Sequence, residues 1–215
     1  MKISTSVIVA ALVSGAGAAH SSDEKYVTCG STVKLAHVES GGKHFLMSDE
    51  RTLQSGSGQQ LVTAAVSTDS HNALWQIREN DGAPACDLGK PIKCGDVIRL
   101  THINTNNNLH THGIKSPLSK QHEVTGFGNG QGEGDSGDDW RVMCSSGEEY
   151  WLREEEVSFR SSATSRYLGS ASNAKFTEQN CGRGCPILNH LEVFGRQQND
   201  QHTKWKTDIG VYLYK

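Results

Sequence analysis

The sequence predicts an all-β protein that folds as a β-trefoil with pseudo-three-fold symmetry. Short β-prone runs alternate with polar turns rich in glycine (23 residues), and no window carries a long helical period. Three of the four tryptophans, Trp75, Trp140 and Trp205, follow one another at equal intervals (140 − 75 = 65 and 205 − 140 = 65). Four short strands around each tryptophan (3 × 4 = 12) close most economically as a trefoil, which leaves few free strand edges.

The opening strand of each unit carries the clearest repeat. Unit one begins VTCGSTVKLAH at Val27, and unit two begins IKCGDVIRLTH at Ile92, with Cys, Gly, Leu and His matching. Unit three begins VSFRS at Val157 and keeps only the apolar alternation and the basic residue. The match makes His102 the equivalent of His37. It also predicts a shared core layer formed by Leu35, Leu100 and Phe159.

Two further strands and a closing tryptophan complete each unit. The second strands are expected at 45–48, 109–112 and 167–170, and the third strands at 60–63, 121–125 and 190–193. Each tryptophan follows an Asp-containing loop, at 69–75, 135–140 and 200–205. A ligand-stacking role for these tryptophans is the alternative to core packing. Recurrence in all three units favours the core.

The N-terminus has the pattern of a secretory signal peptide at 1–19, with Lys2, an apolar run and small residues before the cleavage point. An N-terminal helix of the mature fold is the alternative. The remaining residues, 20–215, are expected to form a single domain without a transmembrane segment. The net charge of −3 and the pI of 6.4 argue against a nucleic-acid-binding surface.

Six cysteines in an oxidising compartment suggest disulfides. The repeat places Cys29 and Cys86 at the two ends of unit one, and Cys94 and Cys144 at the two ends of unit two. Pairing first with last inside each unit contributes about 4 kcal/mol in the chain-entropy treatment. The remaining cysteines, Cys181 and Cys185, lie in a glycine-rich turn. A local disulfide is favoured there, with a redox pair or half of a zinc site as alternatives.

The segment THINTNNNLHTH at 101–112 raises the question of a metal centre. His110 and His112 point to the same face of a strand, and His102 comes from the partner strand. With one residue of slack in the turn, His110 aligns with Leu46 and Leu168. The other two units build the same hairpin without this trio, which favours a hydrogen-bonded or exposed hairpin over a metal site.

The acidic stretch 133–139 offers carboxylates with calcium-like spacing, yet it lacks the EF-hand pattern. A solvated loop entering the Trp140 strand is the favoured interpretation. The polar side chains of this region are candidate contacts for a partner or a glycan: His102, His110, His112, Asp138 and Asp139.

Several segments resemble the stromal cell-derived factor 2 family, namely VTCGSTVKL, SGSGQQLVT, PIKCGDVIRLTHINTNNNLHTH, SPLS, EVTGFG, EGDSGDDW and YWLREEEVSF. The similarity runs from about residue 26 to residue 205. It implies three MIR repeats, at approximately 26–80, 91–144 and 150–207. Cys29, Cys86, Cys94 and Cys144 fall on family positions, whereas Cys181 and Cys185 do not.

The resemblance also implies a role in quality control of protein folding in the endoplasmic reticulum, linked to the unfolded-protein response. The partners it implies are a DnaJ-type co-chaperone, the lumenal Hsp70, misfolded or O-mannosylated clients and protein O-mannosyltransferases. The family usually ends in a retrieval tetrapeptide, whereas this chain ends VYLYK. Retention through a bound partner and secretion are therefore both open.

No catalytic motif or cofactor motif is recognisable, and no enzyme is predicted. Two functions remain: an adaptor or chaperone-associated binding module, and a lectin-like module that binds mannose or another glycan. Ricin-type trefoil lectins carry Gln-x-Trp, whereas Ala73, Asp138 and Thr203 stand two residues before the three tryptophans. This difference favours the adaptor.

Overall fold

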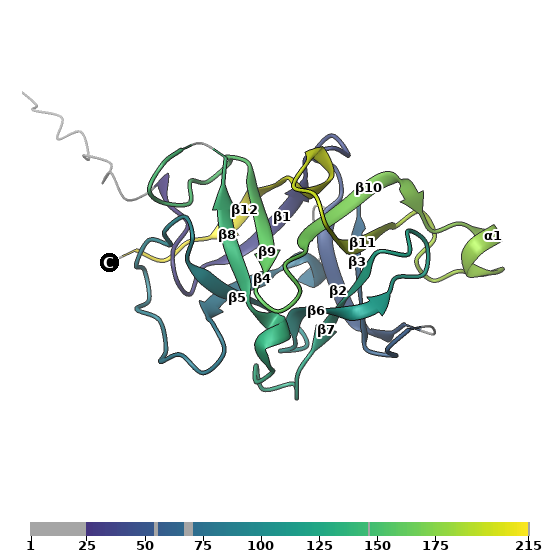
Figure 1. Ribbon diagram of the computed structural model, residues 1–215, viewed down its shortest axis with the longest axis horizontal. Helices are drawn as coiled ribbons and strands as arrows, with labels where there is room; N and C mark the ends of the chain where they lie inside the picture. The colour runs from purple at the N-terminus through teal and green to yellow at the C-terminus, as the bar shows by residue number, and fades with distance from the viewer. Residues whose placement is uncertain (1–24, 54–55, 67–70, 146, 215) are drawn as a thin grey trace, which may run out of the picture.

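The computed structural model describes residues 25–53, 56–66, 71–145 and 147–214 (Figure 1). The predicted signal peptide lies outside these residues. Twelve strands occur in the described part of the chain: β1 (Thr32–His37), β2 (Phe45–Thr52), β3 (Gln60–Ala65), β4 (Trp75–Glu79), β5 (Val97–His102), β6 (Asn108–Lys115), β7 (His122–Phe127), β8 (Trp140–Cys144), β9 (Val157–Ser161), β10 (Tyr167–Lys175), β11 (Leu191–Arg196) and β12 (Trp205–Val211). The helical elements are short: η2 (His71–Ala73), η3 (Ser136–Asp138), η4 (Gln201–Thr203) and α1 (Glu178–Cys181).

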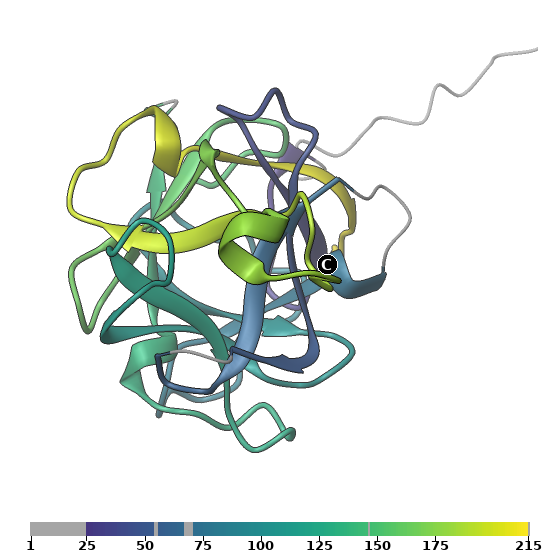
Figure 2. The same ribbon diagram turned by 90° about the vertical axis from the view of Figure 1, so that its right-hand side faces the viewer.

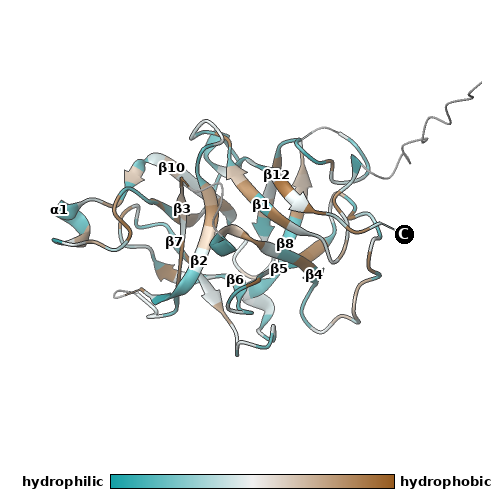
Figure 3. Ribbon diagram, turned by 180° about the vertical axis from the view of Figure 1, so that it is seen from behind, coloured by the Kyte–Doolittle hydropathy of each residue, from teal (hydrophilic) through white to brown (hydrophobic). Residues whose placement is uncertain are grey.

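Six of the strands form a closed barrel. Strand β1 pairs with β4 and β12, β5 pairs with β4 and β8, and β9 pairs with β8 and β12, all antiparallel. The ring therefore returns to its starting strand and satisfies backbone groups that an open sheet would leave at its edges. Hydrophobic residues concentrate along barrel strands such as β1, β4 and β12 (Figure 3).

The other six strands form three hairpins that cover one end of the barrel. The hairpins are β2–β3, β6–β7 and β10–β11, and their second strands β3, β7 and β11 also pair with one another. Figure 2 faces this end, with α1 toward the viewer. A six-stranded barrel capped by three hairpins is the β-trefoil that the sequence predicts.

The predicted core residues are fully buried. Trp75, Trp140 and Trp205 have no exposed surface, and the same holds for Leu35, Leu100 and Phe159. Each indole N–H donates to a backbone carbonyl at the start of a hairpin, with Nε1–O distances of 2.7–3.0 Å to Leu46, Leu109 and Leu168. Burial therefore leaves no unpaired indole N–H at these three positions.

These hydrogen bonds correct the alignment of the second strands. Leu109 is equivalent to Leu46 and Leu168, and not to Phe45 and Tyr167. The turn between the first two strands holds two more residues in unit one than in unit two (46 − 37 = 9 and 109 − 102 = 7), whereas one residue of slack was expected. A slip of one residue moves a side chain to the other face of a strand. His110 is therefore not at the core position of Leu46.

Two histidines are part of the repeated core. His37 and His102 are fully buried, and their rings lie 5.0 Å from those of Trp205 and Trp75. Their Nε2 atoms lie 3.1 Å from the carbonyl oxygens of His202 and Asn72. Ser161 takes this place in unit three, opposite Trp140. His102 is thus the equivalent of His37, as the repeat predicts.

We expect Trp140→Phe to lower the free energy of unfolding by lost packing plus a lost hydrogen bond worth about 1 kcal/mol. Trp75→Phe and Trp205→Phe should behave alike, because each indole makes the same contact. Chemical denaturation monitored by circular dichroism measures the change.

Trp151 is the matched control for these three substitutions. It is equally buried, but its Nε1 has no hydrogen-bond partner among the described residues. Trp151→Phe therefore removes packing without breaking a hydrogen bond. Equal losses for all four substitutions would contradict the importance of the indole contacts.

Candidate functional site

The three histidines of segment 101–112 do not form one cluster. His102 bridges the Thr105 hydroxyl and the Asn72 carbonyl, at 3.0 and 3.1 Å. His110 contacts Asp138, and His112 contacts Glu123, each at 2.9 Å. Burial lowers the pKa of the His102 imidazole, and its contact with the Asn72 carbonyl only partly offsets this effect. His102 is therefore a neutral core residue without surface for a partner.

His110 and His112 do share a face of β6, with ring centroids 5.2 Å apart. His110 Nδ1 lies 2.9 Å from Asp138 Oδ1, which is buried with it. Asp138 Oδ2 accepts hydrogen bonds from the Asp135 backbone N–H at 2.9 Å and from Asn108 Nδ2 at 3.2 Å. Asp138 thereby caps η3 and fastens it to β6.

This geometry corrects part of the expectation of a solvated acidic loop, because residues 133–136 are exposed whereas residues 137–139 are buried. Asp138 is fully buried, and Asp139 is nearly so. Asp139 Oδ1 accepts from the Asp81 backbone N–H at 2.8 Å, and burial raises the pKa of its carboxyl. The loop folds back over β6, which no local pattern of charges reveals. Neither carboxylate is available as a surface contact.

His110, Asp135 and Asp138 bring potential metal ligand atoms within 4.8 Å of one another. Four of their polar atoms already have partners, however: His110 Nδ1, Asp135 Oδ1 and both oxygens of Asp138. Asp135 Oδ1 accepts from the Gly137 N–H at 2.7 Å, and both oxygens of Asp138 are engaged. We therefore assign this cluster a structural role, in which charge and hydrogen bonds hold η3 in place.

The hairpin loops of the three units anchor one another through one equivalent position. This position precedes the valine of each third strand and is occupied by Leu61, Glu123 and Glu192. Glu192 of unit three accepts the backbone N–H groups of Leu118 and Ser119 in unit two, at 2.6 and 2.8 Å.

The other two units complete a cycle of anchors. Glu123 of unit two accepts the Ser57 N–H of unit one at 3.2 Å. Leu61 of unit one packs against Phe176 and Ile187 of unit three. Each unit therefore holds the loop of the unit before it, with unit one holding that of unit three, twice through a carboxylate and once through an apolar side chain.

The apolar contact lies beside an open groove of about 650 Å³, which we call the cap groove. Residues from all three units line it: Glu50, Arg51, Thr52, Leu53, Leu61, Pro117, Phe176, Asn180, Cys181, Pro186 and Ile187. Arg51 steadies one wall, because its Nη1 donates to the Pro186 carbonyl at 2.7 Å while the guanidinium pairs with Asp49. A concave apolar site of this size suits a small ligand or an extended peptide.

Sequence reasoning missed the cap groove. Its residues come from three loops that only the closed trefoil brings together. The one local signal is the occurrence of Leu53, Phe176 and Ile187 in otherwise polar turns.

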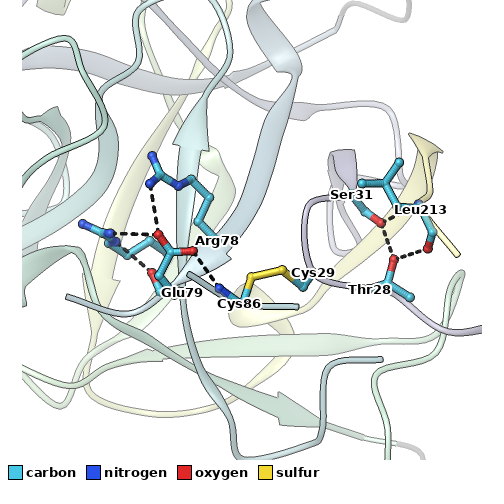
Figure 4. Close-up of a disulfide and its surroundings, with 8 residues drawn as sticks. Thr28, Cys29, Ser31, Arg78, Glu79, Cys86 and Leu213 are labelled. Carbon is cyan, nitrogen blue, oxygen red and sulfur yellow. Dashed lines mark hydrogen bonds and ion pairs between the residues drawn. A yellow bond between two sulfur atoms is a disulfide. The ribbon is translucent and has the colours of Figure 1, made fainter. Parts of the chain in front are cut away.

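The disulfides follow the pairing that the repeat predicts. Cys29 is joined to Cys86, Cys94 to Cys144, and Cys181 to Cys185. Figure 4 shows the first of these, where Glu79 accepts from the Cys86 N–H and from Arg78. Nearby, Thr28 and Ser31 hold the backbone of Leu213. Cys181 and Cys185 thus form the local disulfide, rather than a zinc half-site.

Known proteins share both the sequence and the fold. The MIR domain family matches residues 20–166. Stromal cell-derived factor 2 of Mus musculus is 42% identical over 213 residues, which cover 99% of this chain and 93% of the mouse protein.

Solved structures extend the likeness. The crystal structure of the SDF2-like protein from Arabidopsis thaliana has a TM-score of 0.78 and 31% identity, covering 88% of this chain and 98% of the plant one. The S. cerevisiae protein O-mannosyltransferase Pmt1–Pmt2 complex bound to the sugar donor has a TM-score of 0.71. It is 24% identical over 87% of this chain and 26% of the yeast chain, which shows a shared fold.

Stability should fall as the pH drops below about 6.5. Burial lowers the pKa of five imidazoles: His37, His44, His102, His122 and His190. Below this pH the unfolded chain binds protons that the folded chain does not bind. The free energy of unfolding therefore falls as the pH is lowered, until the pKa values of the folded protein are reached. Urea unfolding at a series of pH values tests this. His122→Gln should make the dependence shallower, and rising stability between pH 6.5 and pH 5 would contradict the assignment.

Asp138→Ala should lower the free energy of unfolding by about 3 kcal/mol, because it leaves buried donors of His110, Asn108 and the backbone without an acceptor. Thermal and urea unfolding measure the loss. The exposed neighbour Asp135 is the control: Asp135→Ser keeps a capping acceptor and should cost less than about 1 kcal/mol. Strong stabilisation of the wild type by added Zn²⁺ or Ca²⁺ would overturn the structural role.

Proposed function

Because the chain belongs to the stromal cell-derived factor 2 family of MIR-domain proteins, we propose that it is a non-catalytic adaptor in quality control of protein folding along the secretory pathway. Its partners in this proposal are a DnaJ-type co-chaperone and the lumenal Hsp70. Its clients are misfolded or O-mannosylated proteins. The single observation that carries the proposal is the relationship to stromal cell-derived factor 2 over 99% of the chain.

The chemistry of the described residues supports a binding role. The polar clusters of unit two are occupied by hydrogen bonds that hold the fold, as for His110 with Asp138 and His112 with Glu123. The cap groove, in contrast, presents the half-buried Leu53 and the nearly buried Phe176 and Ile187 beside the exposed, charged Glu50 and Arg51. Apolar side chains of an unfolded client fit such a surface.

The fold shared with a yeast protein O-mannosyltransferase supports the link to O-mannosylation. The likeness covers about a quarter of the yeast chain, so this chain corresponds to one module of that protein. No helix in the described part of this chain is long and apolar enough to cross a bilayer. We propose that the protein acts in the lumen of the endoplasmic reticulum or after secretion, directed there by the segment at 1–19.

A second candidate function is glycan binding, and one observation favours it. A polar pocket of about 590 Å³ lies between the unit-two loop and β10. Its lining includes the amides of Gln121, Asn173 and Asn180 and the cation Arg196. Side-chain amides donate and accept hydrogen bonds and a guanidinium donates them, which suits the hydroxyl groups of a sugar.

A pull-down distinguishes the two functions. The protein with a C-terminal affinity tag, captured from a native lysate of secretory-pathway membranes, should recover the lumenal Hsp70 and a DnaJ partner. Leu53→Glu places a charge in the cap groove and should reduce recovery of misfolded clients about tenfold, a change of roughly 1.4 kcal/mol in binding.

Val66→Glu is the matched control, because Val66 is 68% exposed and does not line the cap groove. It should leave recovery unchanged. If neither chaperone is captured and the protein binds tightly on a glycan array, the adaptor function is contradicted and glycan binding is supported.

A further inference from the structure

The third disulfide differs from the other two in the chain segment that it closes. Cys181 and Cys185 are 4 residues apart, whereas the other pairs are separated by 57 and 50 residues. A cross-link stabilises a fold less when it closes a shorter loop. Opening of this bond therefore leaves the barrel and its closing disulfides intact.

The turn that carries this disulfide lies at the surface, and Cys181 and Cys185 are each partly exposed. Gly182 and Gly184 have φ values of 91° and 75°, and no atom lies within 4 Å of the place where a Cβ would stand. Arg183 between them is exposed. Of the other four cysteines, Cys29 is 1% exposed within the main core, whereas Cys86, Cys94 and Cys144 are half-buried like Cys181 and Cys185. The short loop, rather than exposure, distinguishes this bond from Cys94–Cys144.

The same disulfide forms part of a binding surface. Cys181 lines the cap groove, and both cysteines pack against the cluster of Leu61, Phe176 and Ile187. Figure 1 shows α1, which contains Cys181, at the end of the molecule opposite the C-terminus. A polypeptide lying in the groove would bring its own cysteine next to this bond.

We propose that Cys181–Cys185 is a thiol–disulfide exchange site for a cysteine of an extended, apolar polypeptide segment held in the cap groove. This inference goes beyond the adaptor function and does not depend on the identity of the chaperone partners. Proximity in the groove supplies the effective concentration that makes exchange selective.

The reaction starts with a thiolate of the polypeptide, which attacks Sγ of Cys181. The Sγ–Sγ bond breaks, and Cys185 leaves with the electron pair as a thiolate. The exposed Arg183 stands two residues before it in the chain, and a nearby cation favours a thiolate. The product is a mixed disulfide between the polypeptide and Cys181.

Two reactions resolve the mixed disulfide. Attack by Cys185 restores the starting state. Alternatively, a second thiolate of the polypeptide attacks the polypeptide's own sulfur and expels Cys181 as a thiolate. The polypeptide then carries a new disulfide and has lost two electrons, and the Cys181–Cys185 pair has gained them. The reverse reaction with a non-native polypeptide disulfide reoxidises the pair, so the cycle isomerises disulfides without another oxidant.

Redox titration of the wild-type protein is the first test. The protein is equilibrated in glutathione buffers, alkylated and analysed by mass spectrometry of peptides. Cys181–Cys185 should open at a reduced-glutathione concentration about tenfold lower than the other two disulfides. Opening of all three over the same range would overturn the proposal.

Peptide exchange tests the role of the groove. In Cys185→Ser, Cys181 has no resolving partner and should accumulate a mixed disulfide with a peptide supplied as its glutathione disulfide. A cysteine flanked by Leu and Phe should react about fivefold faster than one flanked by Gly and Ser. Leu53→Glu in the same background should remove this preference, and Val66→Glu should retain it.

Equal rates for both peptides would overturn the role of the groove. Cys181→Ser is the control for attack at the other sulfur and should trap the peptide more slowly. The double variant Cys181→Ser/Cys185→Ser, checked by circular dichroism, should keep the fold and still recover the chaperones. A failed exchange reaction with intact chaperone recovery is thereby distinguished from a failure of the adaptor function.

Discussion

The structure depends on three buried indole N–H groups that each need an acceptor inside the barrel. A tryptophan in the core contributes large apolar area, but burial of its N–H without an acceptor costs free energy. Each unit meets this need with a carbonyl at the start of its hairpin, on Leu46, Leu109 or Leu168. The contact joins a barrel strand to a cap strand. It thereby fixes the register of the hairpin and decides which side chains of that hairpin face the core.

The symmetry set by the tryptophans is broken at the loops. One equivalent position holds Glu123 in unit two and Glu192 in unit three, where carboxylates bind backbone N–H groups of a neighbouring loop. In unit one the same position is Leu61, which can only pack. Two loops are therefore fixed through carboxylates, and the third through apolar contacts beside the cap groove and the Arg51 hydrogen bond to the Pro186 carbonyl. The cap groove, which is the proposed binding surface, lies next to this asymmetric position.

The sequence was sufficient to predict the fold and the core tryptophans, because the tryptophans recur at a constant interval. It also predicted the disulfides, because two pairs mark the ends of units one and two and the third pair lies within one short turn. It was not sufficient for features that depend on turn length or on distant loops. Two extra residues in the first turn of unit one shifted the alignment of His110 by one position. Asp138 looked like part of a solvated acidic run, although it is the buried last residue of η3. The cap groove forms from three loops, and strand alternation carries no information about how loops converge.

The order in which the barrel closes has a consequence for synthesis. Strand β12 is the last strand of the chain, and it pairs with both β1 and β9. A nascent chain that emerges from its N-terminus therefore presents unpaired edges on the first strand and on β9 until residue 211 has been made. For that interval the partly built barrel offers apolar strands to other chains, and it is itself a substrate for chaperones. A protein proposed to assist the folding of others thus passes through a stage in which it needs the same protection.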